Sequence, residues 1–308
     1  MNHEILNAKE LVHEYLKKKD NGDILKVLNK ICSDNMEKAL LRSIDEHEEW
    51  FGDDKKLKTK EEVMRKKAQD RIKGYFYKTK DELTKSSIYK SSSLAKKLID
   101  DLLSTFFVFL CGVNYFSTLF DRTCEDRFLA SKKTKDDEID AISVGKKPIK
   151  RKRITLEKKV QIRNQNVFKK YSVTLCNEIG DFNCHGLWFN DNCKYSHIIN
   201  PYYSRENLIF FQIFNLDHQI EISRSIFPSI LKNVEDLVNN KALCSIHKKS
   251  GVHVSILTYF LEIFTLKNLK FVHIVCHDKA NHSKSSSGRI LCVNCREYKF
   301  LDKIKNDI

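Results

Sequence analysis

The spacing of apolar residues predicts that the chain begins with helices. Residues 1–48 carry apolar side chains at helical spacing in three short stretches separated by polar breaks. Asp34 can cap the third stretch, with Met36, Leu40 and Ile44 on its inner face. Because three short helices bury little surface by themselves, this segment is expected to pack on another body. Both a dimerisation module and a plain helical subdomain fit the pattern.

Residues 49–128 continue the helical pattern and end in an uncharged, apolar run from 102 to 120. That run is long enough to raise the question of a membrane span. It also contains serine, threonine and asparagine, and a buried core helix explains it without a membrane. We therefore expect no membrane association.

Two later segments are expected to be strands. The apolar run 208–214 predicts a buried strand that ends at Asn215, followed by a helix from about Gln219 that Pro228 bends or interrupts. The run 269–276 is rich in β-branched residues and predicts a second strand. Helices followed by strands and further helices indicate an α+β fold.

The net charge of the chain gives information about its binding partner rather than its fold. Lysine and arginine exceed aspartate and glutamate by enough to give a net charge of +14, which favours nucleic acid first and an acidic membrane second. The charge-dense segment 131–170 is expected to be an exposed insertion. Its basic run 146–153 fits a nuclear-import signal, an arm that contacts DNA, or a solvated linker.

The distribution of cysteine and histidine indicates metal binding in the C-terminal half. No secretory signal opens the sequence, so its ten cysteines are expected to be thiols or metal ligands. Cys184, Cys193 and His197 follow the spacing Cys-x8-Cys-x3-His, and Cys276 can complete a set of four. Three thiolates and one imidazole suit a closed, structural zinc site. Buried cysteines without a metal are the alternative.

A second set of residues suits hydrolysis of a phosphodiester. Asp217-His218 at a strand end, then a strand that opens with Asn268 and closes on Cys276-His277, is the order of an HNH nuclease, also called a ββα-metal site. Asp217 and His277 can hold Mg²⁺, and neutral His218 can act as the general base. Lys279 can offset charge on the phosphate. A structural histidine is the alternative for His218 taken alone.

At these residues the sequence resembles the caspase-activated DNase family, the nuclease subunit of DNA fragmentation factor. The resemblance is strong from about 176 to 282, patchy from 50 to 122 and weak elsewhere. The matching runs are Ser196 to Tyr202 with Ser204-Arg205-Glu206, Asn215 to His218 and Asn268 to His277, with Trp50-Phe51, Arg71-Ile72, Tyr75 and Phe120-Asp121-Arg122 further upstream.

The resemblance implies a Mg²⁺-dependent endonuclease that makes double-strand breaks in chromatin during apoptosis, acts on double-stranded DNA as a homodimer, and occurs in nucleus and cytoplasm. It implies a helical dimerisation module at 1–48 and a nuclease domain at 49–308 whose zinc and catalytic core is 176–285. The implied zinc ligands are Cys184, Cys193, His197 and Cys276, and the implied catalytic residues are Asp217, His218, His277, Lys279 and His282.

Three differences from the family stand out. No N-terminal CIDE domain is visible in the sequence, so association with the inhibitor and chaperone subunit that this domain docks stays open. Arg224 is nearly alone where the family's helix after Asp-His carries several basic residues. The family's long basic tail is replaced by a segment with Cys292 and Cys295, whose role the sequence leaves open.

Two other functions remain as alternatives. One is an HNH nuclease that acts on RNA or single strands. The other is a zinc-stabilised nucleic-acid-binding or scaffold module whose nuclease site is vestigial. The presence of Asp217, His218, His277 and Lys279 together favours an enzyme.

Overall fold

The computed structural model describes residues 33–34, 36–52, 56–128, 168–278, 280 and 282–306. The helices predicted before residue 33, most of the predicted insertion with its basic run at 146–153, and Lys279 lie outside these described residues. Within them the chain is a mixture of helices and short antiparallel strands, as the α+β prediction requires.

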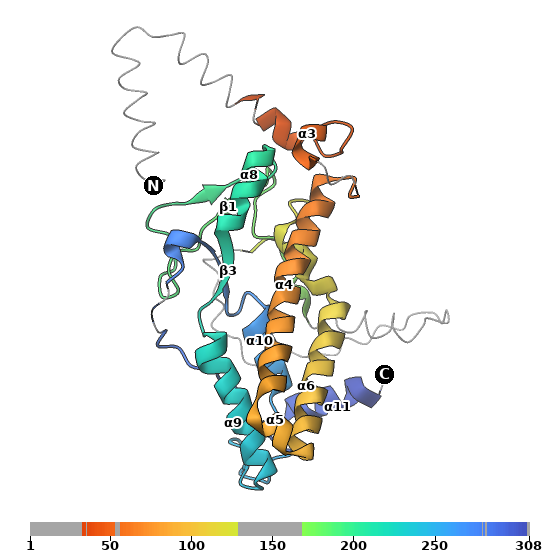
Figure 1. Cartoon of the computed structure of the whole chain (residues 1–308), viewed down its shortest axis with the longest axis vertical. Helices are drawn as coiled ribbons and strands as arrows, with labels where there is room; N and C mark the ends of the chain where they lie inside the picture. The colour runs from red at the N-terminus through yellow and green to blue at the C-terminus, as the bar shows by residue number, and fades with distance from the viewer. Residues whose placement is uncertain are drawn as a thin grey trace.

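Two long helices form the frame of the molecule and lie beside each other in Figure 1. Helix α4 begins after Thr59, whose hydroxyl accepts from the backbone N–H of Glu62 while the Glu62 carboxylate accepts from the Thr59 N–H. Helix α6 begins after Ser92, which caps the Ala95 N–H. The predominantly helical prediction for 49–128 is confirmed by α3 (Glu48–Phe51), α4 (Lys60–Lys85), α5 (Ser87–Ser91), α6 (Ser93–Gly112) and η1 (Asn114–Phe120).

The remaining elements surround this frame. Helices α8 and α9 lie towards opposite ends of the molecule in Figure 1, with β3 between them. In chain order the elements are η3 (Lys169–Tyr171), β1 (Phe182–Asn183), β2 (Ile198–Ile199), α8 (Arg205–Phe210), η4 (Phe211–Ile213), β3 (Phe214–His218), η5 (Ile222–Ile226), α9 (Phe227–Val238), β4 (His253–Val254), α10 (Ile256–Phe264), β5 (Leu269–His273), η6 (Ile274–Cys276), β6 (Ile290–Leu291) and α11 (Arg296–Asn306).

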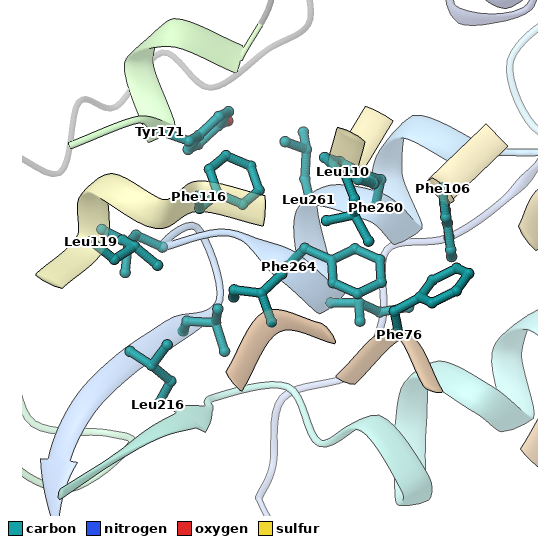
Figure 2. Packing of buried hydrophobic residues seen from close by; sticks show 14 of the residues in the cluster. Phe76, Phe106, Leu110, Phe116, Leu119, Tyr171, Leu216, Phe260, Leu261 and Phe264 are labelled. Carbon is teal, nitrogen blue, oxygen red and sulfur yellow. The ribbon is translucent and has the colours of Figure 1, made fainter. Parts of the chain in front are cut away.

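An aromatic core joins the long helices to the C-terminal half, as Figure 2 shows. Every residue of α10 is buried. Its Phe260 and Phe264 rings lie 5.9 and 5.4 Å from the ring of Phe106 on α6, centroid to centroid. Such aromatic contacts stabilise the fold by more than the burial of their apolar area alone. The core therefore fixes α10, which borders the site described below.

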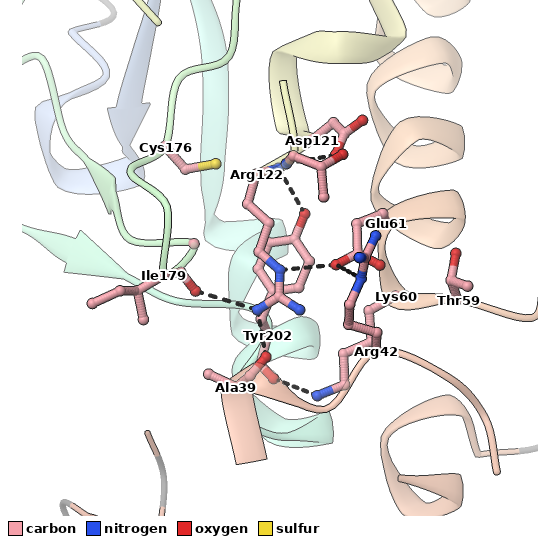
Figure 3. Close-up of polar contacts among 12 residues, drawn as sticks. Ala39, Arg42, Thr59, Lys60, Glu61, Asp121, Arg122, Cys176, Ile179 and Tyr202 are labelled. Carbon is pink, nitrogen blue, oxygen red and sulfur yellow. Dashed lines mark hydrogen bonds and ion pairs between the residues drawn. The ribbon is translucent and has the colours of Figure 1, made fainter. Parts of the chain in front are cut away.

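A buried polar network ties the N-terminal segment to the same frame (Figure 3). The Arg122 guanidinium donates to the Glu61 carboxylate at 2.9 Å and to the backbone carbonyl of Ala39. It also lies over the Tyr202 ring, 4.2 Å from the centroid. Lys60 donates to the Tyr202 carbonyl at 2.8 Å. Both buried cations thus have hydrogen-bond acceptors, as burial demands, and these contacts connect segments far apart in the sequence.

No single helix among the described residues is long and apolar enough to cross a membrane; α6 and η1 meet the criterion only when taken together across a 49° bend.

The predicted strand at 208–214 is wrong for all but its last residue. Residues 205–213 form α8 and η4, and β3 starts only at Phe214. The Ser204 hydroxyl caps the Asn207 N–H, which starts a helix. Leu208 and Phe211 are buried whereas the residues between them are exposed, so the apolar run buries residues at helical spacing.

The second strand is shorter than predicted. It ends at His273 because the His273 ring accepts from the Val275 N–H and closes the 3₁₀ turn η6. That turn exposes Ile274 and Val275 and buries Cys276. The strand therefore ends just before the residues expected to bind metal.

Two other details differ from or refine the predictions. In the third N-terminal helix, Met36 and Leu40 are exposed and Ala39 is buried, so the predicted inner face is wrong for those two residues; Ile44 does pack against the core. Pro228 lies in the first turn of α9, after the π-helical turn η5, where its missing N–H costs little.

Candidate functional site

An antiparallel ribbon of β3 and β5 carries the residues expected to be catalytic. Asp217 pairs with Lys270 and His218 with Leu269 across the ribbon. His277 follows η6, which continues β5. The two segments meet at a pocket of about 540 Å³, which is lined by Asp217, His218, His277 and His282 among others. Four of the five residues expected to be catalytic thus line one pocket, and the fifth, Lys279, lies outside the described residues.

The Asp217 carboxylate and the His277 imidazole form the polar centre of the pocket. Their Oδ1 and Nε2 atoms are 3.2 Å apart. Burial raises the pKa of Asp217, and the nearby His277 opposes this rise. A cation bound between the two groups would stabilise the buried carboxylate. One hard oxygen and one nitrogen, on an open pocket with room for water, fit the small protein ligand set that Mg²⁺ accepts.

The His218 ring is held in one orientation. Its Nε2 atom lies 2.8 Å from the backbone carbonyl oxygen of Ile263, in the last turn of α10. A carbonyl only accepts, so we place the proton on Nε2, which leaves the lone pair on Nδ1. The Tyr75 ring meets the imidazole edge to face at 4.7 Å between centroids. Burial lowers the pKa of His218 to about 4, so the ring is neutral at neutral pH.

Asn268 fixes the loop that leaves β3. Its side-chain amide donates to the carbonyls of Ile220 and Glu262 at 3.0 and 2.7 Å, and its Oδ1 accepts from the Ile220 N–H at 2.6 Å. Asn268 is almost fully buried. It therefore joins the loop after the catalytic pair to α10, which is a positional reason for an asparagine at the start of β5.

His282 completes one wall of the pocket. Its Nδ1 lies 3.0 Å from the Gln219 carbonyl oxygen, and its ring stacks on Trp188 at 4.6 Å between centroids. The Trp188 indole N–H in turn donates to the Asp278 carboxylate. The Nε2 atom of His282 is buried and has no hydrogen-bond partner among the residues that the structure describes, which leaves it available to a bound group.

Two cationic residues of the described part of the chain also line the pocket. Lys78 comes from α4 and Arg224 from the π-helical turn η5, where it pairs with Glu221 at 3.2 Å. Arg224 was noted in the sequence only as a nearly isolated basic residue. Lys78 belongs to a basic stretch of α4. Nothing in the sequence linked this stretch to the catalytic motifs, because only the packing of α4 on β3 brings Lys78 to the pocket.

Beside the pocket, Cys184, Cys193, His197 and Cys276 form a buried group, which we call the first cluster. Their ligand atoms all lie within 4.8 Å of one another. The His197 Nδ1 atom is 3.3 Å from the Cys193 sulfur and 3.4 Å from the Cys276 sulfur, which are themselves 3.6 Å apart. The structure thus brings together the four residues expected to bind zinc.

The geometry of the first cluster fits a tetrahedral zinc ion. Zn–S bonds near 2.3 Å and Zn–N bonds near 2.0 Å give tetrahedron edges of about 3.8 Å between sulfurs and about 3.6 Å between sulfur and nitrogen. The Cys184 sulfur accepts backbone N–H groups of Gly186 and His273 at 3.4 and 3.3 Å, as a thiolate would. Gly186 has φ of +72°, and a Cβ there would meet the Asn192 carbonyl.

The first cluster and the pocket share one stretch of chain. Cys276 belongs to the cluster and His277 to the pocket. The His273 ring at the end of β5 stacks on His197 at 4.2 Å between centroids, a contact that the sequence motifs did not predict. A metal at the cluster would therefore hold the segment that carries His277.

Comparison with known proteins decides the family. The model of the family described as DNA fragmentation factor 40 kDa matches residues 7–299. The chain belongs to this family. The resemblance to caspase-activated DNase that its motifs carry is therefore confirmed.

Curated relatives and a solved structure agree with this assignment. DNA fragmentation factor subunit beta of Homo sapiens is 36% identical over 131 residues, 42% of this chain and 33% of that protein. The same subunit of Bos taurus is 35% identical over 119 residues, 38% of this chain and 31% of that protein. These matches thus span about a third of each relative's length. A crystal structure of caspase-activated DNase shares the fold, with a TM-score of 0.57 and 22% identity over 80% of this chain and 75% of that one.

Proposed function

We propose that this protein is a Mg²⁺-dependent DNA endonuclease of the HNH type that makes double-strand breaks in chromatin. The observation that carries the proposal is the pocket itself. Asp217 and His277 lie 3.2 Å apart, and His218 beside them is oriented by the Ile263 carbonyl. Membership of a family named for DNA fragmentation supports DNA as the substrate.

Each residue of the pocket has a distinct proposed role. Asp217 and His277 would hold Mg²⁺, which when bound supplies positive charge to the phosphate oxygens. His218 would take a proton from the attacking water at Nδ1, because Nε2 is occupied by the Ile263 carbonyl. His282, whose Nε2 has no partner among the described residues, would contact the substrate from the wall of the pocket. Lys279 would offset charge on the phosphate.

Lys78 and Arg224 would extend the positive surface beyond the reacting phosphate. Both line the pocket, and the chain as a whole carries a net charge of +14. Contacts of this kind strengthen binding to any DNA sequence and weaken as salt rises. The first cluster would hold a structural zinc ion that fixes the position of His277 through its neighbour Cys276.

Double-strand cleavage and the names of the relatives indicate the partners of the proposed enzyme. The described residues hold one set of catalytic groups, so cutting both strands at once is most economical in a homodimer. The relatives are subunits of DNA fragmentation factor by name, which supports an inhibitor or chaperone subunit as a further partner. Nucleus and cytoplasm are the proposed locations.

Incubation of purified protein with supercoiled plasmid tests the proposal. Mg²⁺ should yield linear product early, and EDTA should prevent cleavage. Asp217→Asn should raise the Mg²⁺ concentration needed or lower the rate by at least about 10–100-fold, the range seen when even a neighbour of a metal ligand is lost. Binding without cleavage in Mg²⁺ would identify a nucleic-acid-binding module, and cleavage of RNA or single strands alone would identify a different substrate.

A further inference from the structure

A second group of thiols lies in the C-terminal part of the chain, and neither the proposed cleavage nor the sequence motifs account for it. Cys244, His247, Cys292 and Cys295, the second cluster, place four ligand atoms within 4.8 Å of one another. The sulfur of Cys295 lies 3.5 Å from that of Cys244 and 3.9 Å from that of Cys292. A disulfide would bring two sulfurs to about 2.05 Å. The three cysteines are therefore free thiols.

The distances match the edges of a zinc tetrahedron. The His247 Nδ1 atom lies 3.7, 3.3 and 3.5 Å from the sulfurs of Cys244, Cys292 and Cys295. Zinc with three sulfur ligands and one nitrogen ligand requires edges of about 3.6 Å for sulfur to nitrogen and about 3.8 Å for sulfur to sulfur. One nitrogen equidistant from three sulfurs to within a few tenths of an ångström is a ligand set, whereas casual packing of cysteines needs no such convergence.

The backbone builds the site from two separate pairs. Cys244 and His247 span a tight turn in which the Cys244 carbonyl accepts from the Lys248 N–H at 2.9 Å and the Cys244 N–H donates to the Lys249 carbonyl at 2.8 Å. Cys292 and Cys295 span a turn closed by a hydrogen bond from the Cys295 N–H to the Cys292 carbonyl. Both pairs have the Cys-x2 spacing common in structural zinc sites.

Pairing of β4 with β6 brings the two turns together. His253 lies opposite Leu291, and the Val252 N–H donates to the Leu291 carbonyl at 2.8 Å. The cysteines and Leu291 form a small buried group separate from the main core, with Tyr298 packed against it. So few apolar side chains bury little surface, and a metal cross-link is the usual way in which such a small unit becomes stable.

We propose that Cys244, His247, Cys292 and Cys295 bind a second structural Zn²⁺ ion, which fixes the start of α11 against the rest of the molecule. Helix α11 begins at Arg296, directly after the last ligand. Zinc binding at this cluster can be measured whether or not the protein cleaves DNA.

The second ion would be connected to the pocket through helices α11 and α10. Glu297 on α11 is buried, and its carboxylate accepts from the backbone N–H groups of Leu257 and Thr258 at 2.9 and 3.4 Å. Glu297 therefore caps the start of α10, where the Ser255 hydroxyl instead accepts from the Arg289 N–H. The other end of α10 carries the Ile263 carbonyl that orients His218.

Metal analysis of the full chain tests the proposal without reference to activity. Zinc per chain should be two in the wild type, one for each cluster, and one in Cys292→Ser and in Cys184→Ser. Cys111→Ser removes an exposed thiol outside both clusters and should keep two. One zinc in the wild type that Cys184→Ser removes and Cys292→Ser retains would overturn the proposal.

A second variant covers the case in which Cys292→Ser does not fold. His247 is the exposed member of the cluster, so its substitution disturbs packing least. His247→Cys should keep both zinc ions, and cobalt in their place should show stronger thiolate-to-cobalt absorption than in the wild type. An unchanged cobalt spectrum in His247→Cys would contradict ligation by His247 and overturn the four-residue site.

Discussion

Cys276 and His277 are neighbours in the chain, yet they belong to two very different environments. Cys276 belongs to the first cluster, which consists of three thiols and one imidazole and is largely buried, with Cys276 3% exposed and Cys193 half-buried. The His277 side faces an open pocket with a carboxylate, and the His277 side chain is 36% exposed. Closed thiolate sites suit structural zinc, and open oxygen and nitrogen sites suit exchangeable metals with bound substrate.

The difference shows how one turn of chain can serve stability and chemistry at once. The first cluster supplies four ligand atoms, enough to fill a tetrahedral metal site, whereas the pocket has room for a phosphate and its waters. If this division is right, damage to the cluster should remove fold and cleavage together. Damage to the pocket should remove cleavage and leave the fold.

The largest effect is expected from Cys184→Ser, which removes a sulfur from the first cluster. Structural zinc contributes about 10–16 kcal/mol of apparent binding free energy in zinc-finger peptides, far more than the usual stability of a domain. The variant should lose one zinc per chain, unfold around β1 and β2, and lose cleavage. Thermal unfolding followed by circular dichroism, together with zinc analysis, measures this.

Cys111→Ser is the matched control for that experiment because it replaces an exposed thiol outside both clusters. It should keep the unfolding temperature, the zinc content and the cleavage rate of the wild type. A Cys184→Ser protein that retains its zinc and its unfolding temperature would show that the first cluster is only a group of packed thiols.

A smaller effect, confined to the rate, is expected from His218→Ala. Loss of a general base commonly costs about 10²–10⁴ in rate. DNA binding and zinc content should be unchanged, because His218 is outside both clusters. Single-turnover cleavage of plasmid, with binding measured separately in Ca²⁺, distinguishes the two quantities.

His253→Gln serves as the comparison for His218→Ala, since His253 contacts Asp101 at 2.7 Å and does not line the pocket. Its cleavage rate should stay close to that of the wild type. Should His218→Ala cut within about tenfold of the wild type, another group must take the proton.

The sequence predicted which residues share the pocket better than it predicted what surrounds them. The ordered residues Asp217, His218 and His277 could be recognised because the motif lies at strand ends, and the structure places their side chains around one pocket. Lys78 and Tyr75 reach the same pocket from α4, more than a hundred residues earlier in the chain. Only tertiary packing creates that contact, so no local pattern could reveal it.

Local signals explain the errors as well. The run 208–214 looked like a strand by composition, but the cap at Ser204 and the burial of Leu208 and Phe211 make its first six residues helical. The second cluster carried a readable signal, since Cys244-x2-His247 and Cys292-x2-Cys295 both have metal-ligand spacing. The sequence could not show that β4 and β6 bring the two pairs together.

The smallest effect is expected from Tyr75→Phe, which tests how much the pocket depends on α4. The Tyr75 hydroxyl donates to the Leu216 carbonyl in β3, and burial raises its pKa, so the proton stays in place. Removing one such hydrogen bond should cost about 0.5–1.5 kcal/mol of unfolding free energy, measured by urea denaturation. The Tyr75 ring still contacts His218 in this variant, so the cleavage rate should fall by no more than about tenfold even if the whole loss of free energy falls on the transition state.

Tyr75→Ala also removes the ring that lies 4.7 Å from the imidazole, and it should lower both stability and cleavage rate further. If Tyr75→Phe instead lost as much rate as His218→Ala at nearly unchanged stability, the Tyr75 hydroxyl would take part in the reaction, and α4 would supply a reacting group as well as a supporting one.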